Sequence, residues 1–208
     1  GYHEILTRMR CGDGVIMPDQ FIPLIVQFNL SQRFDMLVLE TLFSSLHQHP
    51  GQRFSVNLLP STLMQKDSAA QIIALFQRYR ISPDLITIEV TEEQAFSNAD
   101  TSQQNLDALR AFGCAIAIDD FGTGYANYER LKHLQADIIK IDGCFVRDIL
   151  TDPLDAIMVK SIVEMARAKQ MSVVAEYVES EPQKARLLEL GVNYLQGYLV
   201  GKPQPLGE

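Results

Sequence analysis

The sequence has few basic residues, few cysteines and no long apolar run. Its 18 lysines and arginines are outnumbered by 26 aspartates and glutamates, and the net charge of −8 argues against a basic surface that binds DNA. No apolar run approaches the about 20 residues that cross a bilayer. The three cysteines, Cys11, Cys114 and Cys144, have no paired metal-ligand spacing. This odd number predicts reduced thiols and a cytoplasmic domain.

Sequence features that divide a chain into domains are also absent. No Gly/Ser-rich linker, low-complexity tract or repeat interrupts the 208 residues, and the four histidines share no motif. What is present is a hydrophobic content of 47%, which is enough to bury one sizeable core. We therefore expect residues 1–208 to form a single domain.

Short β-rich runs alternate with longer helical runs along the whole chain. The expected strands are Tyr2–Leu6, Phe54–Leu59, Leu85–Val90, Ala115–Ile118, Ile138–Ile141, Val173–Glu176 and Tyr194–Gly197. The expected helices are Asp19–His47, Ser68–Tyr79, Ser102–Phe112, Asn127–His133, Leu154–Lys169 and Pro182–Leu190. This alternation predicts parallel strands that are joined by helical crossovers.

Two of the expected helices carry further signals. In the helix near 154–169, the spacing predicts that Ile157, Ile162 and Val163 share an inward stripe with Met158 and Met165. Pro182 lies early in the last helix, where its missing N–H is harmless, and Gly191 follows as a C′ residue.

About seven strand–helix units predict an α/β fold of the TIM type. A modified (β/α)8 barrel with its N-terminal strand missing or truncated accounts for this count most economically. An open doubly wound sheet is the competing architecture, and it usually carries a glycine-rich phosphate loop early in the chain. Because no such loop occurs, we favour the barrel.

Polar side chains recur where the expected strands end. Barrel strands end at one common mouth, so these side chains are expected to converge there. Strand parity places Asp119 on one face with Ala115 and Ala117, so the acids can point inward without a special twist of the strand. The residues concerned are Glu4, Asn57, Glu89, Glu92, Asp119, Asp120, Lys140, Asp142, Glu176, Glu179 and Gln196.

The adjacent acids Asp119 and Asp120 predict a metal site. Two unit charges ~4 Å apart repel by about 4 kcal/mol at an effective dielectric of ~20. Oxygen donors without clustered histidine or cysteine favour Mg²⁺, Mn²⁺ or Ca²⁺. The surplus of acids suggests two ions, an arrangement that suits phosphoryl displacement. Lys140, between Ile139 and Ile141, is expected to be a buried and paired lysine.

Seven segments in order resemble the EAL domain family, whose active members are cyclic di-GMP phosphodiesterases of bacterial signalling. Each segment alone is a weak signal, but the ordered set spans nearly the whole chain. The matching segments are Glu4-Ile5-Leu6-Thr7-Arg8, Ser55-Val56-Asn57-Leu58, Glu89-Val90-Thr91-Glu92, Asp119 through Tyr125, Lys140-Ile141-Asp142 with Phe145, Glu176-Tyr177-Val178-Glu179 and Gln196-Gly197-Tyr198-Leu199.

The resemblance implies a set of metal ligands. Glu4, Asn57, Glu89 and Asp119 would hold a first ion, and Asp119 would bridge to a second ion that Asp120 also binds. The ions would be Mg²⁺ or Mn²⁺, and Ca²⁺ would be inhibitory.

The resemblance also implies roles for the remaining polar residues. Lys140 would hold the attacking water, and Glu176 would lie by the second metal or act as general base. Glu92 would anchor the loop from Phe121 to Tyr128, which in the family couples metal binding, substrate and dimerisation. Asp142 would complete the catalytic set, and three further residues would lie at the substrate: Arg8, Glu179 and Gln196.

The activity implied is metal-dependent hydrolysis of cyclic di-GMP to linear pGpG. The alternative is a cyclic di-GMP receptor or regulatory module with weak or no catalysis. A third hypothesis is a barrel enzyme that uses acid-bound Mg²⁺ for different chemistry. The family also implies a homodimer through the loop after Asp120, regulatory domains in a longer parent chain, and anchoring of that parent to the inner membrane.

Three features depart from the family pattern. Ile5 replaces the commoner alanine of the signature and is expected to point away from the metals. Tyr177 replaces a glycine common between the two glutamates, and its ring would narrow the pocket or stack on a guanine. The opening strand of the family is missing from the sequence.

Overall fold

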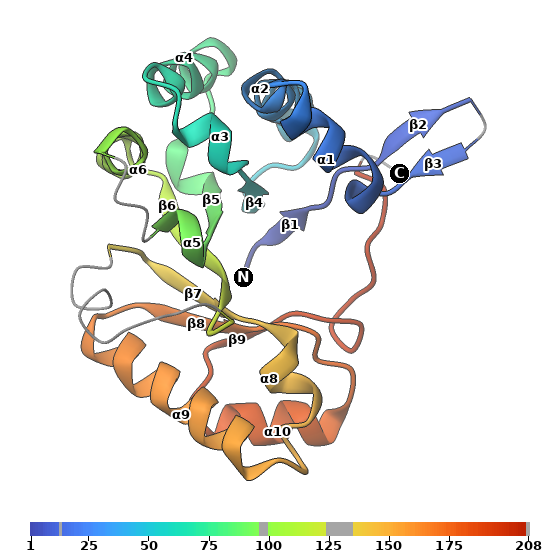
Figure 1. Ribbon diagram of the computed structural model, residues 1–208, viewed down its shortest axis with the longest axis vertical. Helices are drawn as coiled ribbons and strands as arrows, with labels where there is room; N and C mark the ends of the chain where they lie inside the picture. Colours follow the sequence, from blue (N-terminus) through green and yellow to red (C-terminus); the bar gives the residue numbers. More distant parts are fainter. Residues whose placement is uncertain (13, 96–99, 124–134, 207–208) are drawn as a thin grey trace. The chain divides into compact units, whose positions relative to one another are not determined.

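A computed structural model describes residues 1–12, 14–95, 100–123 and 135–206, which form two compact units. The first unit comprises residues 1–90 and 97–115, and the second comprises residues 91–96 and 116–206. Strands and helices alternate along both units, as Figure 1 shows. The predicted α/β alternation is therefore present in each.

The first unit contains three parallel strands with helices beside them. β1 (His3–Ile5) pairs with β4 (Phe54–Asn57), which pairs with β5 (Ile86–Thr91). Aromatic contacts join its helices: the ring centroids of Phe43 and Phe76 lie 4.6 Å apart in a tilted arrangement, and those of Phe76 and Phe112 lie 5.4 Å apart edge to face. The helices are α1 (Pro18–Gln27), α2 (Ser31–Ser45), α3 (Pro60–Leu63), α4 (Ser68–Tyr79) and α6 (Asp100–Phe112), with 3-10 turns at Leu46–Gln48 and Pro83–Leu85.

The prediction of one continuous helix over Asp19–His47 is wrong. The chain forms α1 and then α2, with Asn29 between them at a φ of 55°. This left-handed conformation ends a helix, and asparagine adopts it more readily than most residues. The chain also forms an antiparallel hairpin of β2 (Met9–Cys11) and β3 (Gly14–Ile16), which the sequence reading did not anticipate and which projects beyond α1 (Figure 1).

The second unit contains four parallel strands. β6 (Ala115–Phe121), β7 (Ile138–Ile141), β8 (Ser172–Ala175) and β9 (Tyr194–Leu195) pair in that order. Its helices are α5 (Glu92–Ala95), α8 (Gly143–Arg147), α9 (Pro153–Ala168) and α10 (Glu181–Glu189). The helix expected at Asn127–His133 lies outside the described residues.

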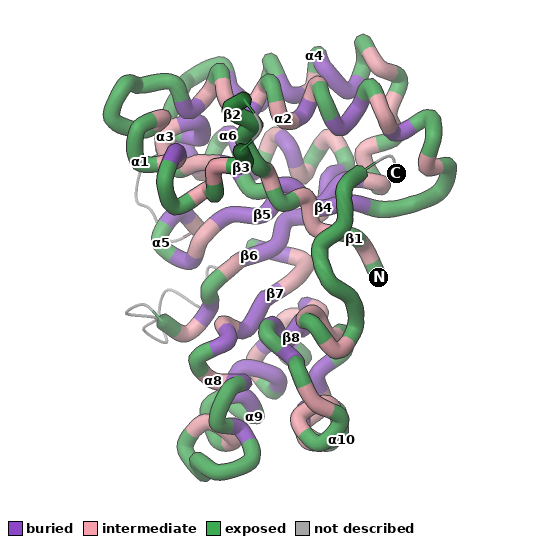
Figure 2. Tube along the Cα trace, turned by 90° about the vertical axis from the view of Figure 1, so that its right-hand side faces the viewer, coloured by how far each residue is buried: buried purple, intermediate pink, exposed green. Residues whose placement is uncertain are grey.

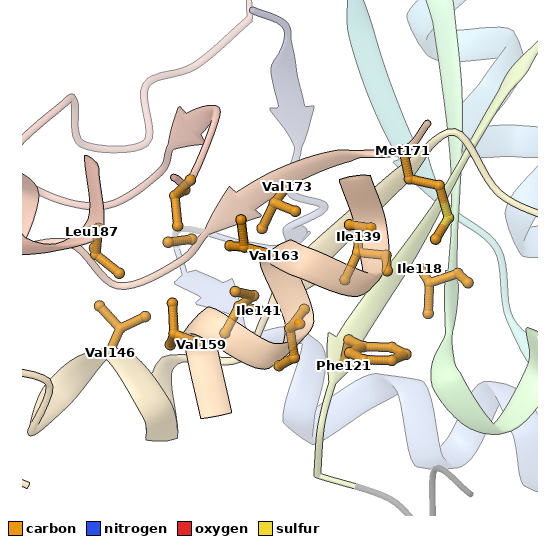
Figure 3. Close-up of a cluster of buried hydrophobic side chains, with 14 of the residues drawn as sticks. Ile118, Phe121, Ile139, Ile141, Val146, Val159, Val163, Met171, Val173 and Leu187 are labelled. Carbon is orange, nitrogen blue, oxygen red and sulfur yellow. The ribbon is translucent and has the colours of Figure 1, made fainter. Parts of the chain in front are cut away.

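The core of the second unit joins α9 to the strands. Figure 3 shows Val159 and Val163 of α9 among the strand residues Ile139, Ile141 and Val173. These side chains are at most 3% exposed. This packing holds α9 against strands β7 and β8.

The inward stripe predicted for α9 is wrong at two positions. Ile157 is 58% exposed and Met158 is 41% exposed, whereas Ile162 and Val163 are buried as predicted. The buried stripe starts at Val159, because positions 159, 162, 163 and 166 follow the i, i+3, i+4, i+7 spacing. The apolar residues of this helix are compatible with two different inward faces, one that includes Ile157 and one that includes Val159. Periodicity alone does not distinguish between these two faces.

The ends of α10 form as its sequence predicts. The Ser180 hydroxyl accepts a hydrogen bond from the backbone N–H of Gln183, and the Gln183 side chain accepts one from the N–H of Ser180. This capping box satisfies N–H groups that the first helical turn leaves open. Pro182 lies in that first turn, and Gly191 follows the helix with a φ of 95°. Both sequence expectations are confirmed.

A buried acid, Asp35, tethers the segment that follows β4. Figure 2 shows buried stretches on the inner side of α2, the helix that carries Asp35. The Asp35 carboxylate accepts hydrogen bonds from the Leu59 N–H at 2.9 Å and from the Thr62 hydroxyl. Burial raises the pKa of Asp35 from 3.8 to about 6, although these two hydrogen bonds lower it. The fold therefore holds a proton that the unfolded chain loses near pH 4.

We expect this proton to make stability depend on pH. Between pH 4 and 6 the folded protein binds more protons at Asp35 than the unfolded chain does, so the free energy of unfolding falls as pH rises. The fall is up to about 3 kcal/mol. Asp35→Asn keeps an oxygen acceptor and removes the titration, so its urea unfolding should show a shallower pH dependence over this range.

The matched control is Asp107→Asn, at an exposed acid on α6. This variant should keep the wild-type pH dependence. Equal slopes for wild type and Asp35→Asn would contradict the assignment.

Candidate active site

Three side chains of the first unit lie on one face of its strands. The parallel register sets Glu4 of β1 beside Ser55 and sets Asn57, at the end of β4, beside Glu89 of β5. Ser55 and Asn57 are two residues apart on β4, so Glu4, Asn57 and Glu89 lie on the same face as Ser55. The Asn57 side-chain N–H donates to Glu4 Oε1 at 2.9 Å, and Glu89 is completely buried. Glu4, Asn57 and Glu89 thus gather as the sequence predicts.

In the second unit, a buried lysine lies between two acids. Lys140 of β7 has no exposed area, and its Nζ lies 3.1 Å from Asp119 Oδ1 and 2.9 Å from Glu176 Oε1. Asp119 comes from β6, and Glu176 directly follows β8. A buried ammonium group is costly unless carboxylates pair with it, so the three groups stabilise one another. The expectation of a buried, paired Lys140 is confirmed.

Asp120 joins this group through an irregularity in its strand. The register of β6 against β7 shifts between Ile118 and Phe121, and Asp120 has a φ of 54°. Such a bulge re-aims side chains, so two consecutive residues can serve one site. Oxygens of Asp119, Asp120 and Glu176 lie within 4.8 Å of one another. The expectation that the acids converge without a special twist is therefore wrong for Asp120.

The crowding of acids affects the pKa of Asp120. Burial raises the pKa of Asp120, and the negative charges of Asp119 and Asp142 raise it further. A hydrogen bond to Asp142 acts in the same direction. The positive charge of Lys140 opposes these effects without cancelling them, so the pKa of Asp120 stays above its ordinary value.

The pKa of Asp142 is shifted in the opposite direction, below its ordinary value. Burial alone would raise its pKa, but hydrogen bonds from Cys144, Asp120 and the Gly143 backbone hold it below its ordinary value. Asp142 caps the N-terminus of α8, where it accepts from the Cys144 N–H at 2.7 Å. An aspartate directly before the first helical residue, Gly143, is a sequence signal for this N-cap role.

Glu92 contacts the chain just after β6. It is buried at the start of α5, and its Oε2 accepts a hydrogen bond from the Gly122 N–H at 2.8 Å. The predicted anchoring loop runs from Phe121 to Tyr128, and residues 124–128 lie outside the described part of the chain. The contact at Gly122 is the part of that expectation which the structure describes.

The residues expected at the substrate lie in more exposed positions. Glu179 is exposed, and its backbone N–H donates to Gln183. Gln196 follows β9, and its backbone is bonded to Ala175 and Val178. Arg8 is exposed in the first unit, where its guanidinium donates to the carbonyl oxygen of Thr7 at 2.8 Å.

The donor atoms fit a divalent metal ion. The carboxylates in the second unit, and the carboxylates with an amide oxygen in the first, are the hard ligands that Mg²⁺, Mn²⁺ and Ca²⁺ prefer. A divalent cation among Asp119, Asp120 and Glu176, whose carboxylate oxygens lie within 4.8 Å of one another, would offset their mutual repulsion. The chemistry of the residues present therefore fits the predicted metal dependence.

The comparisons with known proteins agree on one family. The model of the EAL domain matches residues 1–203. The probable cyclic di-GMP phosphodiesterase PdeA of Escherichia coli K12 is 61% identical over 212 residues, and the match covers 100% of this chain and 29% of PdeA. This chain thus spans less than a third of the length of that relative.

Two solved structures have a similar fold. The PaMucR phosphodiesterase in complex with c-di-GMP has a TM-score of 0.88 at 36% identity, covering 97% of this chain and 84% of PaMucR. A calcium and cyclic di-GMP complex of Klebsiella pneumoniae BlrP1 has a TM-score of 0.79 at 32% identity, covering 88% of this chain and 47% of BlrP1. These matches confirm the predicted α/β fold class of the modified (β/α)8 type.

Proposed function

This chain belongs to the EAL domain family, and we propose that it hydrolyses one phosphodiester bond of cyclic di-GMP to give linear pGpG. The observation that carries the proposal is Lys140, a buried cation held by Asp119 and Glu176 where parallel strands end. A lysine in this position can offset charge on a phosphate and orient a water molecule. The likeness to the phosphodiesterases PdeA and PaMucR supports the same substrate.

The proposed reaction depends on Mg²⁺ or Mn²⁺. Glu4, Asn57 and Glu89 would act as ligands from the first unit, and Asp119 and Asp120 from the second. Two bound divalent ions would lower the pKa of a bound water and neutralise charge that develops on the phosphate. A manganese complex of BlrP1 with cyclic di-GMP supports this choice of metal.

Lys140 and Glu176 carry out the proton chemistry in this proposal. Lys140 holds the attacking water through Nζ, and the Glu176 carboxylate accepts the proton that the water loses. The water oxygen bonds to phosphorus, the bond from phosphorus to one 3′ oxygen breaks, and the proton accepted by Glu176 passes to that leaving oxygen, directly or through solvent water. The 8% exposure of Glu176 is consistent with access from the substrate side.

The other predicted residues hold the site and the substrate in place. Asp142 fixes the start of α8 beside Asp120, and Glu92 fixes the backbone at Gly122. We assign Arg8 to a substrate phosphate, and Glu179 and Gln196 to the rim of the substrate pocket. The assignments of Arg8, Glu179 and Gln196 follow the family resemblance.

The proposal includes partners beyond the substrate. It includes regulatory domains in a longer chain, because this chain spans 29% of PdeA. It also includes a homodimer through the loop after Asp120, which the family resemblance implies. None of the helices in the described ranges is long and apolar enough to cross a bilayer.

Chromatography of the reaction products tests the proposed function. The chain is incubated with cyclic di-GMP and Mg²⁺, Mn²⁺ or Ca²⁺, and the nucleotides are separated. We expect pGpG with Mg²⁺ and Mn²⁺ and intact cyclic di-GMP with Ca²⁺. Tight binding of cyclic di-GMP without pGpG under all three conditions would identify a receptor in place of an enzyme.

A further inference from the structure

Backbone strain in this protein is concentrated where the acids gather. Among the described residues, five that are not glycine have a positive φ. Asn29, Arg80 and Gln170 lie at or just after helix ends, where the left-handed conformation is ordinary. Asp120 and Tyr177 instead lie at the end of β6 and after β8, with φ values of 54° and 55°. Such outliers away from helix ends point to a functional constraint.

The backbone around Tyr177 is held from both sides. The Glu176 N–H donates to the Ile141 carbonyl at 3.2 Å, and the Val178 N–H donates to the Gln196 carbonyl at 3.0 Å. Gly197 lies so close to Val178 that an added Cβ would come within 2.3 Å of the Val178 nitrogen. Hydrogen bonds on both sides of Tyr177 and the close approach of Gly197 therefore hold the backbone in place.

The Tyr177 ring lies against a bare stretch of backbone. A Cβ added to Gly143 would come within 2.3 Å of Tyr177 Cδ2 and 2.6 Å of Cγ, so this packing requires a glycine at the start of α8. Tyr177 as a whole is nonetheless 61% exposed. Contact at Gly143 thus covers part of the ring and leaves a fixed, open aromatic surface.

This open surface lies beside the catalytic acids. Tyr177 directly follows Glu176, whose Oε1 lies 2.9 Å from Lys140 Nζ, and its ring packs on Gly143, which directly follows Asp142. The ring thus lies next to groups that surround Lys140. A phosphate held at Lys140 would bring the adjoining part of its nucleotide close to this aromatic surface.

We propose that Tyr177 is a specificity-determining residue whose ring stacks on a purine base of the substrate. This inference rests on the proposed function and adds a contact that selects nucleotides. Stacking suits an uncharged aromatic surface because a purine presents a flat π-face. The held backbone and the Gly143 contact keep the ring in position before the substrate binds, which lowers the entropy cost of binding.

Steady-state kinetics with cyclic di-GMP and Mn²⁺ tests the contact. Tyr177→Gly should raise KM at least about fivefold and change kcat less than about twofold, because stacking acts on binding. Tyr177→Phe keeps the ring and should stay within about twofold of the wild-type KM. Tyr177→Gly also relieves the left-handed strain, so its Tm should not fall. An unchanged KM in Tyr177→Gly, or a lowered Tm with kcat and KM falling together, would overturn the proposal.

A binding measurement separates this inference from the proposed function. The chain contains no tryptophan, so Tyr177→Trp introduces a single indole fluorophore. With Ca²⁺ present, cyclic di-GMP should quench its emission saturably, while Tyr194→Trp, at the exposed start of β9, should not respond.

The possible failures give different results. Binding of cyclic di-GMP by ultrafiltration without quenching at position 177 would refute the stacking contact and leave the proposed function standing. Absence of both binding and turnover in the wild type would refute both.

Discussion

Lys140→Met should reduce kcat for cyclic di-GMP by about a thousandfold or more. The substitution removes the ammonium group that lies between Asp119 and Glu176, 3.1 and 2.9 Å away, and leaves two carboxylates facing each other. Positioned proton-transfer and charge-offsetting groups typically contribute 10²- to 10⁴-fold. Methionine preserves most of the side-chain length, so packing changes little. Product chromatography at saturating Mn²⁺ measures the loss.

The controls separate loss of chemistry from loss of folding. Lys160→Met changes an exposed lysine on α9 and should leave kcat unchanged. Removing one partner of a buried ion pair costs about 3–5 kcal/mol, so Lys140→Met should also be less stable to urea. Lys140→Met combined with Glu176→Gln should recover part of that stability and none of the activity. Near-normal turnover in a folded Lys140→Met protein would remove Lys140 from the mechanism.

Glu89→Gln should lower kcat at least about a hundredfold and weaken the response to metal. Glu89 is completely buried beside Asn57 in the strand register, so its carboxylate is fixed before any ion binds. Glutamine keeps the shape but is a poorer ligand for a hard cation. Ligands that bind only the folded state raise Tm, so millimolar Mg²⁺ should raise the Tm of the variant less than that of the wild type.

The control for this prediction is Glu93→Gln, at an exposed acid on α5. Its activity and its Mg²⁺-dependent rise in Tm should match the wild type. Equal Mg²⁺ responses for wild type and Glu89→Gln would show that Glu89 is not a metal ligand.

The sequence predicted those parts of the site that follow from strand alternation alone. Lys140, between two isoleucines, is buried and paired, and Glu4, Asn57 and Glu89 share a face because parity and parallel register together require it. These features depend on residues that are neighbours along one strand or in one register. They need no knowledge of how a strand deviates from regularity.

The features that sequence reasoning missed depend on local departures from regular geometry. Strand parity places Asp119 and Asp120 on opposite faces, and the bulge in β6 that brings them together has no clear sequence signal. Periodicity in α9 fitted two phases, and contact with the sheet selected the one that buries Val159 and exposes Ile157. The break at Asn29 depends on one left-handed residue inside a run that otherwise favours a helix.

A single-turnover experiment tests the central claim most directly. The chain, in molar excess over cyclic di-GMP, is mixed with Mn²⁺, quenched at intervals and resolved by chromatography, with an EDTA arm alongside. The account predicts complete conversion to pGpG with Mn²⁺ and none with EDTA. Full recovery of intact cyclic di-GMP from a protein that binds it would contradict the account, because slow product release cannot hide a first turnover.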